Sequence, residues 1–244
     1  MDYFYTHPKN ISPGKIVIDG EEFSHLTRVM RKKAGDVIRI VDGAGAAYDM
    51  RLEEIRKKTA HGIILSSYPS HNEPEIKLTL AVGILKNPSK FDFLVEKATE
   101  IGVYTIVPLK TERTIPSHAK TERWQKLALA AMKQCGRSYL PKVRELITLE
   151  DYLHEENRFD LKLIAHEKQV EQTKVRNRTS SSSGSVVILI GSEGGFSEEE
   201  FKSCINAGYE HLCFGARRLR TETAAIASSS LILIPRLFDE GRGV

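Results

Sequence analysis

The sequence predicts an α/β protein in which a small β-barrel precedes a larger domain built on a mainly parallel sheet. Three observations lead to this fold class. Residues 15–68 contain short stretches of alternating apolar and polar residues separated by turn signals, residues 69–74 are polar and flanked by prolines, and from residue 76 onward apolar runs alternate with helical patterns. We therefore expect a barrel domain over residues 1–72 and a second domain over residues 73–244.

Short strands and one basic helix make up the expected barrel. Apolar alternation predicts strands at Lys15–Asp19, Asp36–Asp42 and His61–Tyr68. Apolar residues at helical spacing predict a helix over Glu22–Arg31. Four cations lie on or beside the outer face of this helix: Arg28, Arg31, Lys32 and Lys33. Such a cluster concentrates positive potential at one place on a small domain.

The second domain alternates strands with helices. Apolar runs predict strands at Ile76–Leu85, Tyr104–Leu109, Leu161–His166, Val186–Ile190 and His211–Phe214. Helical patterns predict helices over Pro88–Gly102, Thr121–Arg137, Ser197–Ala207 and Glu222–Phe238. This order is typical of a parallel sheet with helices on its faces. The last helix is apolar nearly all round, so we expect it to be buried, in part against a second subunit.

The composition narrows the range of functions. A net charge of +4 permits nucleic-acid binding, but only through a local patch. The 3 cysteines show no C-x-x-C spacing and the histidines are scattered singly, so we expect neither a disulfide framework nor a metal site. The sequence contains no apolar stretch that could cross a bilayer and no apolar signal-peptide run at its start, so we expect a cytoplasmic protein without membrane contact.

The stretch Gly191–Ser197 is the sharpest local signal. It reads G-S-E-G-G-F-S and lies where a buried strand ends and a helix begins, the place at which open α/β sheets bind ligands. Ser197 and Glu200 predict a capping box. The patterns of a phosphate loop, a dinucleotide turn and a hydrolase elbow are absent, and the acidic run Glu198–Glu200 would repel a phosphate. A neutral or cationic ligand is favoured, although a glycine-rich loop taken alone more often forms only a tight turn.

A second loop, Phe214–Ala225, follows the strand His211–Phe214. It reads F-G-A-R-R-L-R-T-E-T-A-A and places three arginines directly before an apolar helix. Packing does not explain three arginines so close together, and the alternative is an exposed, solvated turn. Two such loops in similar positions favour a binding site.

These loops, together with Q-C-G-R at Gln134–Arg137 and E-K-A-T-E-I-G at Glu96–Gly102, resemble the 16S ribosomal RNA uridine N3-methyltransferase family. The motifs occur in that family's order and cover the second domain, and the first domain is similar to the family's PUA-like barrel. Ser192 departs from the family, because many members have proline there. This difference should alter the stiffness of the loop rather than its chemistry.

The resemblance implies a SPOUT fold, with a parallel sheet and a C-terminal segment threaded into a trefoil knot, and a homodimer with the cofactor site beside the interface. It also implies an activity: transfer of a methyl group from S-adenosyl-L-methionine to N3 of one uridine, at the expected position 1498, in 16S rRNA of the small ribosomal subunit. Knots are very rare in proteins, so the knot rests on the family resemblance alone.

Three loops would hold the cofactor by this resemblance: the end of the strand Leu161–His166, the loop Gly191–Gly195 and the turn Gly215–Leu219. The residues expected to bind it are Ala165, His166, Glu167, Ile190, Gly191, Glu193, Gly194, Gly195, Gly215, Leu219 and Thr223. Leu219 would pack on the adenine. Glu193 is the candidate for accepting a hydrogen bond from a ribose hydroxyl.

The N3 atom of uridine must lose its proton before it can attack a methyl group, so the acceptor site needs a base or a cation that stabilises the anion. Arg220 and Glu222 are the catalytic candidates. Arg220 would stabilise the uridine anion or instead hold an RNA phosphate. Glu222 would accept the proton or instead cap the helix that follows, and these alternatives stay open.

RNA binding needs cations on the barrel and at the mouth of the site. The candidates are Arg28, Arg31, Lys32, Lys33, Arg113, Arg137, Arg217 and Arg218. We expect the target base to be extruded into the site. One rival function is a SPOUT methyltransferase that acts on a ribose 2′-hydroxyl or a guanine of transfer RNA, which would need a different acceptor pocket. Another is a non-catalytic RNA-binding or ribosome-assembly protein, which the intact cofactor loops disfavour.

Overall fold

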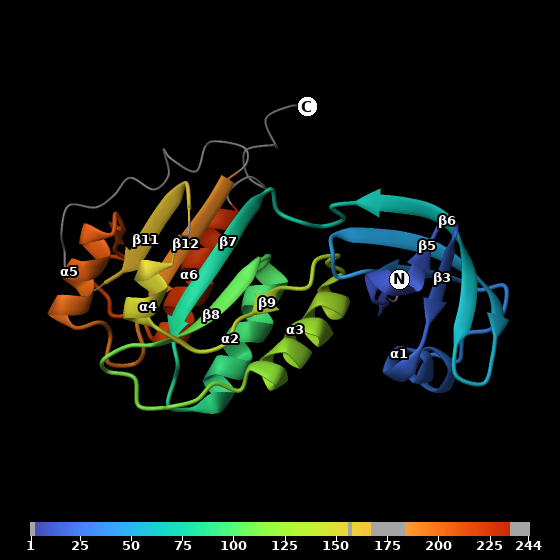
Figure 1. Cartoon of the computed structure of the whole chain (residues 1–244), viewed down its shortest axis with the longest axis horizontal. Helices are drawn as coiled ribbons and strands as arrows, with labels where there is room; N and C mark the ends of the chain where they lie inside the picture. Colours follow the sequence, from blue (N-terminus) through green and yellow to red (C-terminus); the bar gives the residue numbers. More distant parts are fainter. Residues whose placement is uncertain (1–2, 156–157, 167–183, 235–244) are drawn as a thin grey trace. The chain divides into compact units, whose positions relative to one another are not determined.

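The structure is a computed structural model that describes residues 3–155, 158–166 and 184–234 (Figure 1). A set of strands with one short helix comes first, and alternating strands and helices follow, which confirms the predicted α/β class. Across the described part of the chain, none of the helices has both the length and the apolar character needed to span a lipid bilayer.

The chain divides into two compact units. The N-terminal unit comprises Met1–Glu73 together with Leu129–Leu140, and the C-terminal unit comprises Pro74–Ala128 together with Pro141–Val244. The segment Leu129–Leu140 was expected in the second domain, but its apolar side chains pack with those of the N-terminal unit. The C-terminal half of one long helix thus belongs to the N-terminal unit.

The N-terminal unit is built on a six-stranded sheet. Its strands are β1 (Tyr3–Tyr5), β2 (Ile11–Ser12), β3 (Lys15–Ile18), β4 (Val37–Val41), β5 (Ala46–Ile55) and β6 (Ala60–Pro69). They lie in the order β1-β4-β5-β6-β3-β2, with β1 parallel to β4 and the other neighbours antiparallel. A short 3-10 turn, η1 (Pro8–Asn10), joins β1 to β2. Apolar side chains from β1, β3, β4, β5 and the helical segment form one core.

Strand β5 is the longest element that the sequence pattern did not predict. Its buried side chains are Ala47, Met50 and Leu52, which are not evenly spaced by two. The pairing with β6 shifts register between Asp49 and Met50, so a bulge interrupts the alternation. The regular pattern of a half-buried strand is therefore lost in the sequence, although the hydrogen-bonded pairing is extensive.

The basic helix is shorter than predicted and changes type along its length. An α-helical turn, α1 (Gly20–Ser24), continues as a π-helical turn, η2 (His25–Val29). Arg31 then adopts a left-handed φ of 51°, which ends the helical path before the predicted residue. The cations that follow Arg28 therefore lie on an irregular segment rather than on a helix.

The C-terminal unit is built on a fully parallel sheet. Its strands are β7 (Ile76–Gly83), β8 (Thr105–Lys110), β9 (Lys142–Val143), β10 (Ile147–Thr148), β11 (Leu161–Ala165), β12 (Gly184–Ile190) and β13 (Glu210–Leu212). The order is β10-β8-β7-β12-β11-β13, with β9 also paired to β8. Every pair is parallel, so the carboxyl ends of all these strands share one edge.

Helices flank this sheet (Figure 1). They are α2 (Pro88–Ile101), α3 (Thr121–Cys135), α4 (Leu149–His154), α5 (Glu198–Asn206) and α6 (Thr221–Leu233). Asn87 caps α2 by accepting from the Ser89 backbone N–H at 3.0 Å, and Gly102 ends it with a φ of 114°. On the same unit, Phe91 stacks on the only tryptophan, Trp124, with ring centroids 4.1 Å apart.

Helix α6 packs against α2 and against strands β7 and β12. It begins at Thr221, one residue before the predicted start, and ends at Leu233 with Ile234 as its C-cap; residues 235–238 of the predicted helix lie outside the described residues. Its buried side chains include Ala225, Ser228 and Ile232, which accounts for its apolar composition. Its N-terminus therefore lies at the sheet edge where the strands end.

Candidate active site

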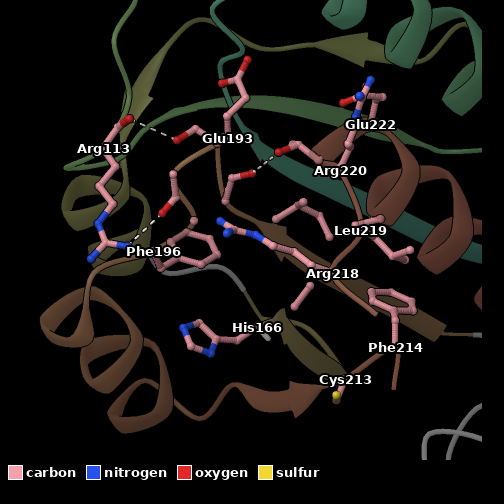
Figure 2. A pocket seen from close by; sticks show the side chains of 18 of the residues that line it. Arg113, His166, Glu193, Phe196, Cys213, Phe214, Arg218, Leu219, Arg220 and Glu222 are labelled. Atoms are coloured by element: carbon pink, nitrogen blue, oxygen red, sulfur yellow. Dashed lines mark hydrogen bonds between the residues drawn. The ribbon is translucent and has the colours of Figure 1, made fainter. Parts of the chain in front are cut away.

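A cavity of about 500 Å³ lies at the carboxyl edge of the parallel sheet (Figure 2). Three chain segments line it: residues 165–166 after β11, residues 190–198 after β12 and residues 213–222 after β13. These are the segments in which the sequence predicts binding. The parallel topology brings them together, because each follows a strand that ends at the same edge.

The glycine-rich loop folds tightly onto itself. The Gly195 backbone N–H donates to the Ser192 carbonyl at 2.9 Å, and Gly195 has a left-handed φ of 70°. A Cβ atom at Gly191 would lie 2.8 Å from the Gly195 backbone, so no side chain fits there. The predicted capping box is confirmed, since Ser197 accepts from the Glu200 N–H at 3.2 Å and Glu200 accepts from the Ser197 N–H at 2.9 Å.

Neighbouring segments hold the loop in place. An Arg113 guanidinium N–H donates to the Gly194 carbonyl at 2.9 Å, and the Thr221 hydroxyl donates to the Gly191 carbonyl at 3.0 Å. The end of β7 also presses on the loop: a Cβ atom at Gly83 would lie 2.5 Å from the backbone nitrogen of Ser192. The loop is therefore fixed by the sheet, by α6 and by the segment after β8.

The residues expected to bind a cofactor mostly line this cavity. Those that do are Ala165, His166, Ile190, Gly191, Glu193, Gly194, Gly195, Gly215 and Leu219. Thr223 is exposed on α6 and does not line the cavity, and Glu167 lies outside the described residues. Glu193 accepts from the Lys86 backbone N–H at 3.0 Å, so one of its oxygens already has a partner.

The segment after β13 contributes both apolar and cationic side chains. Phe214 and Leu219 are partly buried, whereas Arg217 and Arg218 are exposed. Figure 2 shows the Arg218 side chain extending across the cavity. The apolar groups can pack on a flat ring, and the arginines place positive charge at the entrance.

A buried histidine, His211, fixes the backbone of one of the segments that line the cavity. His211 on β13 is 5% exposed, and its Nε2 donates to the His166 carbonyl at 3.0 Å. Its Nδ1 is buried and has no hydrogen-bond partner in the described part of the chain. This bond joins the ends of β11 and β13, so His211 positions the backbone at His166.

The two catalytic candidates lie at the start of α6. Arg220 is exposed at the N-cap position, and its side chain makes no capping hydrogen bond. Glu222 forms an ion pair through Oε1 with Lys90 Nζ at 3.3 Å. Its other oxygen, Oε2, is buried and accepts no hydrogen bond from any described residue. Both residues line the cavity, and the Glu222 carboxylate faces Lys90 rather than the backbone of its own helix.

Lys90 is the main cavity residue that sequence reasoning missed. It lies on α2, far from both loops in the sequence, and no local motif marks it. One signal was available: Lys90 is a cation in the first turn of a helix, where the helix dipole favours acidic residues. The lining also includes Phe196 and Ala224, which lie within the two predicted motifs but were not named as binding residues, and Cys213 directly after β13.

The expected RNA-binding cations of the N-terminal unit are solvent-accessible. Arg28, Arg31 and Lys33 are exposed, and Lys32 is partly so. A second basic segment, missed in the sequence, is the exposed turn Arg56–Lys58 between β5 and β6. The two lie at the same end of the sheet, because the Gly35 N–H donates to the Leu52 carbonyl at 2.7 Å, a few residues before this turn.

Arg137 is a correction to the expected RNA contacts. It is 3% exposed, and its guanidinium forms an ion pair with Glu73 at 2.7 Å. Glu73 also accepts from the backbone N–H groups of Ser138 and Tyr139, both at 2.8 Å. A buried, paired guanidinium has no face for a phosphate, so Arg137 stabilises the N-terminal unit instead.

Among residues 3–155, 158–166 and 184–234, no group of three or more His, Cys, Asp or Glu side chains is arranged to hold a metal ion.

Comparison with known proteins identifies the class to which the chain belongs. Residues 72–233 match the family described as RNA methyltransferase domain, and residues 18–65 match the RNA methyltransferase PUA domain. The parallel sheet with a glycine-rich cavity, together with these matches, defines an RNA methyltransferase. The N-terminal unit accordingly has the PUA fold.

Individual relatives narrow this class. A ribosomal RNA small subunit methyltransferase E from Buchnera aphidicola is 30% identical over 86% of this chain and 84% of its own length. One from Bacillus subtilis is 28% identical over 88% of each chain. The crystal structure of one from Neisseria gonorrhoeae, bound to S-adenosyl methionine, matches with a TM-score of 0.83 and 31% identity, over 95% of this chain and 96% of that one. The chain belongs to the ribosomal RNA small subunit methyltransferase E family.

Proposed function

We propose that this enzyme transfers a methyl group from S-adenosylmethionine to N3 of one uridine in 16S rRNA. The observation that carries the proposal is the meeting, in one cavity, of the glycine-rich loop and a buried carboxylate oxygen, Glu222 Oε2, to which none of the described residues donates a hydrogen bond. The glycine-rich loop suits the binding of a cofactor. The Glu222 carboxylate suits the binding of a methyl acceptor that must lose a proton, because it can accept that proton.

The residues of the cavity suit S-adenosylmethionine. The volume of about 500 Å³ falls within the range of roughly 300–1,000 Å³ for small-molecule sites. Glycine at 191 lets the loop close tightly on itself at the cavity wall, and Phe214 and Leu219 supply apolar surface for the adenine. Glu193 and Glu198 place acidic groups on the wall, which suits a sulfonium cation.

The chain's own residues handle the acceptor. Glu222 Oε2 accepts the N3 proton, and the partly exposed Glu222 carboxyl group loses it to solvent once the product has left. The cations beside it stabilise the negative charge left on the base. S-adenosylmethionine, when bound, supplies an electrophilic methyl group, which N3 takes as the carbon–sulfur bond breaks with its electron pair on sulfur. The sheet edge holds both loops rigidly, so the two reactants meet in a fixed geometry.

RNA binding is assigned to the cations of both units. A PUA-like domain over residues 1–72 grips the ribosomal RNA through Arg28–Lys33, while Arg113, Arg217 and Arg218 bind phosphates near the cavity of the methyltransferase domain, residues 73–244. The target uridine is extruded into the cavity. The protein acts in the cytoplasm as a homodimer with a trefoil knot in its methyltransferase domain, and the family resemblance supports the dimer and the knot.

The test is transfer of labelled methyl from S-adenosylmethionine to small ribosomal subunits that lack the modification, with the product nucleoside identified by mass spectrometry. We expect N3-methyluridine at a single position of 16S rRNA. Label in transfer RNA, on a ribose or on guanine would overturn the assignment of the acceptor. Absence of both label and cofactor binding would indicate a non-catalytic RNA-binding protein.

A further inference from the structure

We infer that Lys90, Glu222 and Arg220 together recognise the imide edge of a uracil base, and that Lys90 is a specificity-determining residue of the reaction. This inference rests on the proposed function, since it says how the enzyme recognises the uracil base that accepts the methyl group. It adds a residue from a different helix, α2, to the two candidates on α6.

The first observation is the unequal environment of the two Glu222 oxygens. Oε1 lies 3.3 Å from Lys90 Nζ, and Oε2 is buried without a partner in the described residues. The Glu222 side chain is 13% exposed, so water does not readily satisfy Oε2. A buried acceptor without a donor is destabilising, because it has lost its hydrogen bonds to water. A ligand that brings an N–H group to this atom would remove that cost.

The second observation is the placement of Lys90 at the wrong end of a helix. Lys90 lies in the first turn of α2, beside the positive end of the helix dipole, and Asn87 already caps that helix. Lys97 on the same helix is a useful comparison, because both lysine side chains are 33% exposed. Lys97 pairs with Glu96 and Glu100 of its own helix, whereas Lys90 reaches across to α6. The stability of α2 therefore does not explain a lysine at this position, whereas the ion pair that Lys90 makes with Glu222 in the cavity lining does.

The third step is the chemistry of the base. The imide edge of uracil presents carbonyl O2, the N3–H donor and carbonyl O4, that is, acceptor, donor, acceptor. Lys90 offers a donor and Glu222 an acceptor, and Arg220, at the N-cap of the same helix as Glu222 and lining the same cavity, offers a second donor. Cytosine presents an acceptor at N3 and a donor at N4, so it would face like groups at two of the three positions.

The same arrangement favours the reaction. When the N3 proton moves to Glu222 Oε2, the negative charge of the base spreads onto O2 and O4. Both oxygens then face a cation, Lys90 on one side and Arg220 on the other. Lys90 thus contributes more to the anion than to the neutral base, which is the property expected of a group that lowers the barrier.

The experiment compares Lys90→Met with the matched control Lys97→Met. The substrates are small subunits assembled on 16S rRNA that is transcribed with either uridine or 5-fluorouridine, whose N3 proton is more acidic. We expect Lys90→Met to lower kcat by about a hundredfold on uridine. The loss should shrink by about fivefold or more on 5-fluorouridine, because that anion needs less stabilisation. Lys97→Met should keep wild-type kcat on both substrates.

Further readouts separate recognition from folding. Calorimetry should give Lys90→Met an unchanged dissociation constant for S-adenosylmethionine, and Lys90→Arg should recover part of the activity, because it keeps the cation. Glu222→Gln serves as a second variant that removes the same ion pair without a change of shape. Equal losses on the two RNA substrates, or weakened cofactor binding by Lys90→Met, would overturn the inference. A wild-type enzyme that yields no N3-methyluridine would overturn the proposed function itself.

Discussion

Neutralising Glu73 tests the assignment of Arg137 as a structural residue. Glu73 binds the Arg137 guanidinium at 2.7 and 3.1 Å and accepts from two backbone N–H groups, both at 2.8 Å. The Arg137 and Glu73 side chains are only 4% and 11% exposed. Removing one partner of such a pair costs about 3–5 kcal/mol, because the other charge stays buried. We expect Glu73→Gln to lower the free energy of unfolding by about 3 kcal/mol, since the amide oxygen still accepts from the backbone. Glu73→Ala also removes that acceptor and should cost about 5 kcal/mol.

The assay is urea denaturation of the full chain followed by circular dichroism at pH 7. Glu54→Gln is the matched control, because the pair Arg56–Glu54 has a similar length, 2.8 Å, but its side chains are 58% and 55% exposed. This control should show no measurable change. A loss below about 1 kcal/mol in Glu73→Gln would refute the reasoning. So would a stable Arg137→Met variant whose RNA affinity became less sensitive to salt, because that result would return Arg137 to the RNA-binding surface.

Three further predictions concern single groups. Thr221→Val deletes the buried hydroxyl that donates to the Gly191 carbonyl at 3.0 Å. It should lower the free energy of unfolding by about 1–2 kcal/mol, measured by urea denaturation followed by tryptophan fluorescence. It should also weaken S-adenosylmethionine binding in calorimetry, and unchanged affinity would show that this bond does not hold the loop. Burial raises the pKa of the Cys204 thiol to about 12. This fully buried cysteine should therefore react with thiol reagents at pH 8 only as the protein unfolds. Fast labelling of Cys204 in the native protein would contradict this prediction. Hydrogen bonds from Arg39 lower the pKa of Asp49, and a lowered carboxylate pKa stabilises the fold above the unfolded value of about 3.9. Asp49→Asn should therefore cost about 2 kcal/mol at pH 7. Its difference from wild type should begin to shrink as the pH falls below about 4 and vanish only below the lowered native pKa; a pH-independent difference would refute the linkage.

Much of the sheet architecture could be predicted from the sequence, because the signals are local. Buried parallel strands such as β7 and β12 are continuous apolar runs, and the capping box at Ser197 fixes the start of α5. Strand β5 escaped prediction because a bulge breaks its alternation. The end of the basic helix was placed too late, since the positive φ of Arg31 is a conformational choice that no residue pattern announces.

The candidate site was predictable only in part, because some of its residues carry local motifs and others reach it only through contacts between segments that are distant in the sequence. Its loops carry their own motifs, so residues such as Gly191 and Arg220 could be named in advance. Lys90 reaches the cavity through the packing of α2 on α6, which a sequence pattern does not encode. Arg137 looked like an ordinary surface cation, and only its pairing with Glu73, distant in sequence, shows that it is buried.

The contact between β7 and the glycine-rich loop has a consequence for how the protein tolerates mutation. Gly83 does not line the cavity, yet even alanine there would place its Cβ atom 2.5 Å from the Ser192 nitrogen and displace the loop backbone. In a saturation library selected for methyl transfer, position 83 should accept glycine alone. A statistical ranking of functional positions would then count a strand residue outside the cavity among the most constrained in the enzyme.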